Sequence, residues 1–233
     1  MIRLNMEVEM SSKDCITVFV LIIFSLFTSS CKEEQPNEPK GGNESCPGIP
    51  TVTYEGKVYN TIQIGNQCWL KENLDVGKRI DGNDDQTDNG IKEKYCYDND
   101  TANCNTYGGL YQWDEAMQYS SSDDTQGICP IGWHIPTLEE FNTLVNALSS
   151  SANALKNIGQ GTGTNTSGFS ALLAGYRKRE GSFSYLNGGT GFWISSESSD
   201  SCAWVLELHS DRDDVVFDCY YKDIGFYIRC IKD

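Results

Sequence analysis

The chain has 233 residues and carries 33 acidic against 18 basic side chains, a formal net charge of -15 at pH 7. Phosphate backbones and anionic lipid surfaces attract Lys and Arg, so this balance argues against nucleic acid and against a basic membrane-binding patch. About 200 residues remain beyond an N-terminal targeting segment, enough for one domain with a sizeable core.

The first 30 residues have the features of a secretion signal. Residues 16–27 form an apolar run that is shorter than the roughly 20 residues of a membrane-spanning helix and typical of a signal-peptide core. Small residues follow, and then Cys31, which resembles the lipidated cysteine of a bacterial lipoprotein signal. Residues 32–34, Lys-Glu-Glu, resemble the signal that exports Bacteroidetes lipoproteins. We therefore expect a signal peptide over residues 1–30 and an outer-membrane lipoprotein exposed at the cell surface.

The residues after the anchor differ sharply from the rest of the chain. Residues 35–45 contain Pro, Gly and polar residues but no apolar side chain. Such a composition cannot bury a core. We expect a flexible tether over residues 31–48 and a single domain over residues 49–233.

The first half of the domain alternates strand and loop signals. Residues 51–70 are rich in β-favouring side chains, and Gly65-Asn66 predicts a hairpin turn within them. Residues 81–90, DGNDDQTDNG, indicate a polar loop. Residues 110–119 place Leu110, Trp113 and Met117 on one face of a predicted helix.

The clearest helix signal follows Pro136. Thr137 and Glu140 have the spacing of a capping box, in which the hydroxyl and the carboxylate bond each other's backbone N–H groups. Apolar residues then recur at helical spacing, namely Leu138, Phe141, Leu144, Val145 and Leu148. The pattern predicts a helix with one buried stripe.

The second half of the domain favours strands. Residues 169–176 and 192–196 are short apolar runs typical of central strands. Residues 202–208 and 215–221 predict a hairpin around a charged turn, and residues 225–231 predict a closing strand. Residues 159–168 and 182–191 are expected to be loops, and a binding surface is expected at these two loops or at residues 81–90.

Eight cysteines lie beyond the N-terminal segment, and no CxxC pair occurs. An even count without closely spaced ligand pairs favours four disulfides over zinc. Eight cysteines allow 105 connectivities. Symmetry of the predicted hairpin about residues 210 and 211 favours Cys202 with Cys219, the short polar turn favours Cys96 with Cys104, and a link between the domain ends favours Cys129 with Cys230. Cys46 and Cys68 remain as the fourth pair of this hypothesis.

Metal binding is the first function considered. Four hard oxygen donors lie in one loop, namely Asp81, Asn83, Asp85 and Asp88. An EF-hand loop starting at Asp81 would need Gly and Glu where the chain has Gln86 and Lys92. A solvated acidic loop is therefore favoured over a calcium site, and no cofactor is expected.

Catalysis has few candidate residues. The chain has two histidines, His134 between apolar residues and His209 at the edge of the predicted hairpin turn. A packed or surface position is expected for the former and a solvated one for the latter. Cysteines held in disulfides are no nucleophiles. We therefore expect no catalytic residue.

Sugar binding is the third candidate, because aromatic faces stack on sugar rings while polar groups bond the hydroxyls. Trp193 and Trp204 are expected in the core of strands. The residues expected to be exposed at a ligand site are Tyr185, Tyr220, Tyr221 and Arg212.

Several long segments resemble the Fibrobacter succinogenes major paralogous domain family. They are EKYCYDND, YGGLYQWDEAM, GWHIPT, GFSALLAGYR, FWISSE and GFYIRC, and the resemblance covers roughly residues 51–233. Members are typically secreted or surface lipoproteins. The order of Pro136-Thr137, Glu140 and a terminal Gly-Phe-x-x-Arg is similar to the C-type-lectin-like fold of formylglycine-generating enzymes. The resemblance implies an α+β domain with two main helices, short twisted antiparallel sheets, long loops and neighbouring termini.

Together these observations predict a lipid-anchored surface protein with a non-catalytic binding or adhesion domain. Its expected partners are the membrane, through the anchor, and a glycan or a surface protein. Two alternatives stay open. One is an enzyme related to formylglycine-generating or carbohydrate-active enzymes, and the other is a purely structural module of a surface coat.

Overall fold

The computed structural model describes residues 44–122 and 125–233, which belong to one compact unit over residues 39–233. The expected signal peptide, Cys31 and most of the expected tether lie outside the described residues. Among the helices of the described residues, none has both the length and the apolar character that crossing a membrane requires.

The first five-stranded sheet joins the two ends of the domain. Its strands run in the order β1 (Thr51–Tyr54), β2 (Lys57–Ile64), β3 (Gln67–Leu70), β12 (Ile231–Lys232) and β6 (Trp133–His134). The β2–β3 hairpin has the expected turn, with Ile64 opposite Gln67. Gly65 at φ +58° occupies the left-handed region that favours glycine. The last strand lies between early ones, so the domain termini are neighbours.

The second five-stranded sheet is built from the C-terminal half. Its order is β11 (Val216–Tyr221), β10 (Cys202–His209), β9 (Gly189–Ser199), β7 (Ala174–Arg177) and β8 (Phe183–Leu186). All neighbours are antiparallel except β7 and β9. A small parallel pair, β4 (Lys78–Arg79) and β5 (Glu93–Lys94), completes the strands. The described residues thus form a mixed α+β domain in which strands dominate.

The helices are short. They are the 3-10 turn η1 (Tyr97–Asn99), α1 (Thr101–Tyr107), α2 (Trp113–Ala116), α3 (Leu138–Ala147) and α4 (Ala152–Leu155). The capping box that opens α3 is confirmed, because Thr137 accepts from the Glu140 N–H and Glu140 accepts from the Thr137 N–H. The helix expected over residues 110–119 shrinks to α2, since Leu110 and Tyr111 form β-bridges to Tyr95 and Phe226.

The predicted closing strand is also shorter than expected. Only Ile231 and Lys232 pair as a strand, because the preceding residues cross between different partners. Gly225 bridges to Arg177, Phe226 to Tyr111 and Tyr227 to Phe192. The C-terminal segment therefore ties the two large sheets together.

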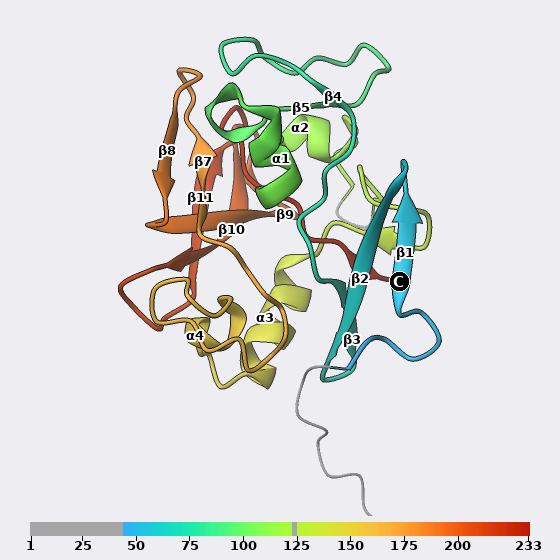
Figure 1. The fold of residues 1–233 in the computed structure, drawn as a ribbon. Helices are drawn as coiled ribbons and strands as arrows, with labels where there is room; N and C mark the ends of the chain where they lie inside the picture. Colours follow the sequence, from blue (N-terminus) through green and yellow to red (C-terminus); the bar gives the residue numbers. More distant parts are fainter. Residues whose placement is uncertain (1–43, 123–124) are drawn as a thin grey trace, which may run out of the picture. The chain divides into compact units, whose positions relative to one another are not determined.

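The core has two clusters on opposite faces of the second sheet. Phe192 and Leu206 join the cluster that includes α3, while Trp193 and Val205 join the one that includes α2, and residues of the first sheet contribute to both. Adjacent residues of a strand point to opposite faces, which explains the division. Figure 1 shows α3 between the two large sheets, where its apolar stripe is buried.

Four disulfides cross-link the described residues. They join Cys46 to Cys68, Cys96 to Cys104, Cys129 to Cys230 and Cys202 to Cys219. These four pairs are the ones that the sequence-based hypothesis predicted.

The geometry behind the last pair differs from the expectation. Cys219 lies opposite Trp204, and Cys202 lies opposite Tyr221, so the cysteines are diagonal neighbours. Tertiary contacts of the hairpin turn set this register. The Asp213 carboxylate accepts from the Ser151 hydroxyl, and the Lys156 ammonium donates to the Arg212 carbonyl. The turn is thereby anchored on α4, which sequence symmetry cannot show.

Candidate functional site

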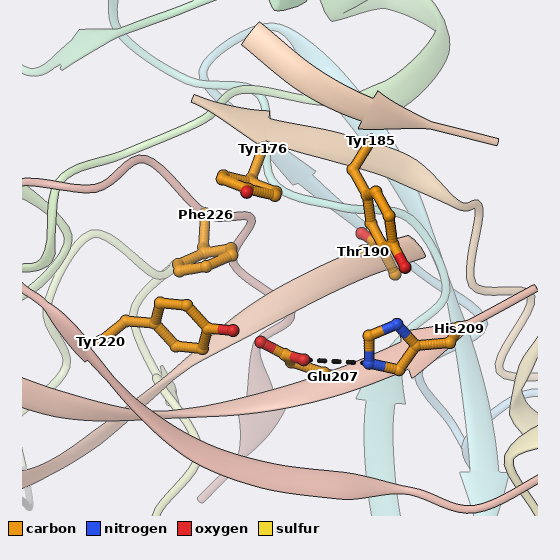
Figure 2. Close-up of a pocket in the computed structure, with 7 residues that line it drawn as sticks. All are labelled: Tyr176, Tyr185, Thr190, Glu207, His209, Tyr220 and Phe226. Carbon is orange, nitrogen blue, oxygen red and sulfur yellow. Dashed lines mark hydrogen bonds and ion pairs between the residues drawn. The ribbon is translucent and has the colours of Figure 1, made fainter. Parts of the chain in front are cut away.

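An aromatic pocket of about 230 Å³ opens on the second sheet. It is lined by Tyr176, Tyr185, Thr190, Glu207, His209, Tyr220 and Phe226. In Figure 2 the four aromatic rings surround the opening from above and from both sides, while the carboxylate of Glu207 and the imidazole of His209 lie along the remaining side. The lining combines ring faces with a few polar groups, as small-ligand sites usually do.

Two glycines of β9 create the hollow. Gly191 lies opposite Glu207 and Gly189 opposite His209 in the β9–β10 register. A Cβ on Gly191 would lie 2.5 Å from the Phe226 ring, and one on Gly189 would lie 2.6 Å from the Tyr185 ring. Any side chain at either position would fill the space that the rings now occupy. The Gly-Thr-Gly sequence therefore shapes the pocket.

Tyr185 is held in an uncommon backbone conformation at the rim. Its φ is +71°, a region that costs a non-glycine residue free energy and that is found preferentially at functional sites. Its ring meets the His209 ring edge-on at a centroid distance of 5.9 Å. The side chain is 49% exposed, so a bound molecule can reach its face.

Phe226 forms the base of the aromatic wall. Its ring centroid lies 5.5 Å from that of Tyr176 and 5.1 Å from that of Tyr220. On its other side it packs edge-on against Trp193 at 5.0 Å. The Trp193 indole N–H donates to the carbonyl of Tyr111 at 2.7 Å. The wall is thus supported by a fully buried tryptophan and should be rigid.

The polar side of the pocket is centred on Glu207. Its Oε2 lies 3.0 Å from Nε2 of His209, and the two side chains are only 12% and 14% exposed. The pKa of Tyr220 is raised, mainly by burial and then by a hydrogen bond to the Glu207 carboxylate. Burial also raises the pKa of Tyr176, with a smaller contribution from the charge of Glu207. Both phenols therefore stay protonated at neutral pH and can donate hydrogen bonds.

Thr190 lies on β9 between the two pocket glycines and opposite Leu208. Because adjacent residues of a strand point to opposite faces, its side chain belongs to the face of Leu208 and not to that of Gly191 and Glu207. The residue is 4% exposed, and its hydroxyl oxygen is buried without a hydrogen-bond partner within the described residues. Thr190 therefore borders the pocket without presenting its hydroxyl to a ligand.

The structure brings only part of the expected ligand site together. Tyr185 and Tyr220 both line the pocket. Tyr221 points elsewhere and lies under the guanidinium of Arg179, 5.0 Å from its ring centroid. Arg212 lies in the hairpin turn and pairs with Asp214 at 3.4 Å. The expectation for His209 was wrong, because it is buried and paired in the pocket instead of being solvated.

The acidic loop does not gather its carboxylates around one point. Asp81 bonds the backbone and side chain of Asn83, while Asp85 accepts from Gln112. Asp88 is exposed. Among the described residues, no group of three or more His, Cys, Asp or Glu side chains is placed to hold a metal ion.

His134 lies in a second, open cavity beside the N-terminus of α3. Its Nδ1 is 2.7 Å from Asp233, and its Nε2 is 3.0 Å from both carboxylate oxygens of Glu140. Glu140 already serves the capping box. The hydrogen bond to Glu140 is the main cause that raises the pKa of His134 to about 8, against the opposing effect of burial. The same contact helps to lower the pKa of Glu140, which burial alone would raise.

This arrangement predicts a pH-dependent contribution to stability. Because the His134 pKa is higher in the folded than in the unfolded protein, its contribution is complete below about pH 6.5 and is lost as the pH rises through about 8. Partial exposure limits the effect to about 1 kcal/mol. Urea unfolding at several pH values should show this loss in the wild type and not in His134→Gln. Parallel pH profiles of the two proteins would contradict the expectation.

The sheet order, the four disulfides and the aromatic pocket of the described residues define a cross-linked α+β module. The family model of the Fibrobacter succinogenes major domain matches residues 62–232, and the chain belongs to this family. No curated protein and no solved structure matches the chain.

Five of the seven pocket residues were not among the expected ligand residues: Tyr176, Thr190, Glu207, His209 and Phe226. One signal for them exists in the sequence. Glu207 lies on the strand predicted over residues 202–208, and His209 follows its last residue. Two residues apart in an extended chain share a face, and Gly189 and Gly191 have the same spacing. No local pattern, however, shows that these two pairs lie opposite each other.

Proposed function

We propose that this protein is an outer-membrane lipoprotein, anchored through Cys31, whose domain binds a glycan at the cell surface without catalysis. One observation carries the proposal: the pocket combines four aromatic rings with the carboxylate of Glu207 and the imidazole of His209. Ring faces stack on the C–H face of a sugar, and the polar groups bond its hydroxyls. The pocket volume of about 230 Å³ suits a single sugar residue of a longer chain.

The finer assignment of the fold, C-type-lectin-like, belongs to the same proposal. It is supported by the pairing of β12 with β3, which makes the domain ends neighbours, and by the capped entry to α3. A domain whose ends meet can be displayed on a tether with its pocket free.

Pocket variants test the glycan proposal. We expect Tyr185→Ala and Tyr220→Ala each to weaken glycan binding roughly tenfold, since a lost stacking contact is worth about 1 kcal/mol or more. Tyr221→Ala is the matched control, because Tyr221 follows Tyr220 on β11 but is 55% exposed and lies outside the pocket. A glycan array with correctly oxidised protein identifies the ligand, and calorimetry measures the variants. An array without hits, or equal affinity in all three variants, would refute the proposal.

The anchor is tested separately. We expect Cys31→Ser to move the protein from the membrane fraction to the soluble fraction, because the acyl chains can no longer be attached. Cys15→Ser is the control, since this cysteine lies in the expected signal peptide and its loss should leave the anchor intact. Fractionation followed by immunoblotting gives the answer, and protease treatment of whole cells tests exposure at the surface. Membrane association of the Cys31→Ser protein would contradict the anchor.

A catalytic role is the second candidate, because Glu207 and His209 form a carboxylate–imidazole pair inside the pocket. Two features favour binding instead. Most glycosidases use two carboxyl groups across the scissile bond, whereas Glu207 is the one carboxylate among the lining residues. Each of the eight cysteines in the described residues is held in a disulfide. Glycan cleavage that is lost in His209→Gln would overturn the non-catalytic proposal.

A further inference from the structure

The pocket has an unbalanced charge. Glu207 is the one carboxylate among the lining residues, and none of them is a lysine or an arginine. With histidine neutral, the lining carries a formal charge of -1. Glu207 is 12% exposed, so water screens this charge only partly. A neutral ligand that closed the pocket would take the Glu207 carboxylate out of water with no lysine or arginine beside it, which is costly.

The aromatic wall also favours a positively charged ligand. The faces of aromatic rings carry partial negative charge and attract cations within about 6 Å of the ring centroid. Neighbouring rings around the opening have centroid distances of 5.1 to 6.5 Å, so a small cation among them reaches several faces. Several aromatic faces beside one acidic group are the arrangement that recognises organic ammonium ions.

The remaining charges of the protein do not oppose the binding of a cation in the pocket. The net charge of -15 attracts cations over long distances. Lys222, which directly follows β11, is bound to Glu197 at 2.8 Å and does not line the pocket. Glu207 is bonded by His209 and Tyr220, yet a carboxylate can accept about four hydrogen bonds. It can therefore accept a further donor from a ligand.

We infer that the pocket selects sugars that carry a protonated amine over their neutral or N-acetylated counterparts. This inference rests on the proposed glycan-binding function. The sugar ring stacks on the aromatic wall, while its ammonium group lies among the ring faces and donates to Glu207.

The test compares two ligands with the same backbone, short oligomers of glucosamine and short oligomers of N-acetylglucosamine. Calorimetry is performed near neutral pH, where an amine with a pKa of about 8 is mostly protonated. We expect the glucosamine oligomer to bind at least about tenfold more tightly, the value of one hydrogen bond to a charged group. Glu207→Gln keeps the size of the side chain and should abolish the preference. Glu197→Gln is the matched control, because it makes the same charge change on β9 outside the pocket.

The outcomes separate the inference from the proposal on which it rests. A preference that is lost in Glu207→Gln and kept in Glu197→Gln supports the inference. Equal binding of both oligomers by the wild type, or a preference that survives Glu207→Gln, overturns it and leaves glycan binding intact. Failure of both oligomers here and of every sugar on the array overturns both. Thermal unfolding establishes that each variant is folded.

Discussion

Replacing Cys129 and Cys230 with alanine is expected to lower the free energy of unfolding by about 4 to 5 kcal/mol, the largest loss from removing any one of the four disulfides. The two cysteines are 101 residues apart. In the chain-entropy account, a cross-link stabilises by restricting the unfolded chain, by about 4.7 kcal/mol for a loop of this length. A loss of this size is a large fraction of the stability of an ordinary domain.

The bond also positions the pocket. Cys230 lies at the end of the segment that crosses between the sheets, four residues after Phe226. Its carbonyl accepts from the N–H of Leu70 on β3 at 3.0 Å. Without the bond, this segment is held to the residues after Cys129 by the short β12–β6 pairing and by packing. We therefore expect ligand affinity to fall along with stability.

The matched control removes the disulfide between Cys96 and Cys104, which closes a loop of only eight residues. The same account assigns about 2.5 kcal/mol to this bond, so the two double variants should differ by about 2 kcal/mol. Urea unfolding of the purified, oxidised proteins measures both. Equal losses would contradict the chain-entropy account and point to local packing as the main effect of these bonds.

The second large effect is expected for Arg229→Ala, at about 3 kcal/mol or more. Arg229 is 1% exposed, and its guanidinium donates to Asn73 Oδ1 at 2.8 Å and to the Phe169 carbonyl at 2.6 Å. It also lies over the Phe169 ring, 4.3 Å from the centroid. Removal leaves these buried acceptors unpaired and opens a cavity, and each defect costs more than 1 kcal/mol.

The charge of Arg229 persists despite its burial. Burial lowers its pKa to about 9, which still leaves the guanidinium protonated at neutral pH. Arg229→Lys keeps the charge but cannot reach two acceptors with one planar group, so we expect it to restore only part of the loss. Arg179→Ala is the surface control, because Arg179 is exposed and pairs with Asp223; a loss below about 1 kcal/mol is expected there. Similar losses for Arg229→Ala and Arg179→Ala in chemical unfolding would refute the structural role.

The sequence predicted those elements whose causes are local. The β2–β3 hairpin follows from Gly65, and the start of α3 follows from Thr137 and Glu140, because each needs only residues a few positions apart. The predictions failed where distant segments compete for the same backbone groups. Leu110 pairs with Tyr95 instead of starting a helix, and Gly225 pairs with Arg177 instead of entering a strand.

The same contrast between local and distant causes applies to the residues of the candidate site. Tyr185 and Tyr220 could be selected from the sequence because exposed aromatic residues are typical of sugar binding. Glu207 and His209 could not, because their role depends on the β9–β10 register that places Gly191 and Gly189 opposite them. Phe226 reaches the pocket from a segment that bridges two sheets. Its position follows from contacts with Trp193 and Tyr220, far away along the chain.

By itself, the sequence determined the family and the α+β class, through the resemblance of its long segments to known ones. It also determined the capped helix and the number of disulfides, which follow from local spacing and from the cysteine count. The tertiary structure alone decided the register of the β10–β11 hairpin and the assembly of the pocket. The reason is physical in both cases. The turn is fixed by Lys156 and Asp213 bonding across it to α4, and the pocket exists only where β7 to β11 and the C-terminal segment bring their side chains to one face.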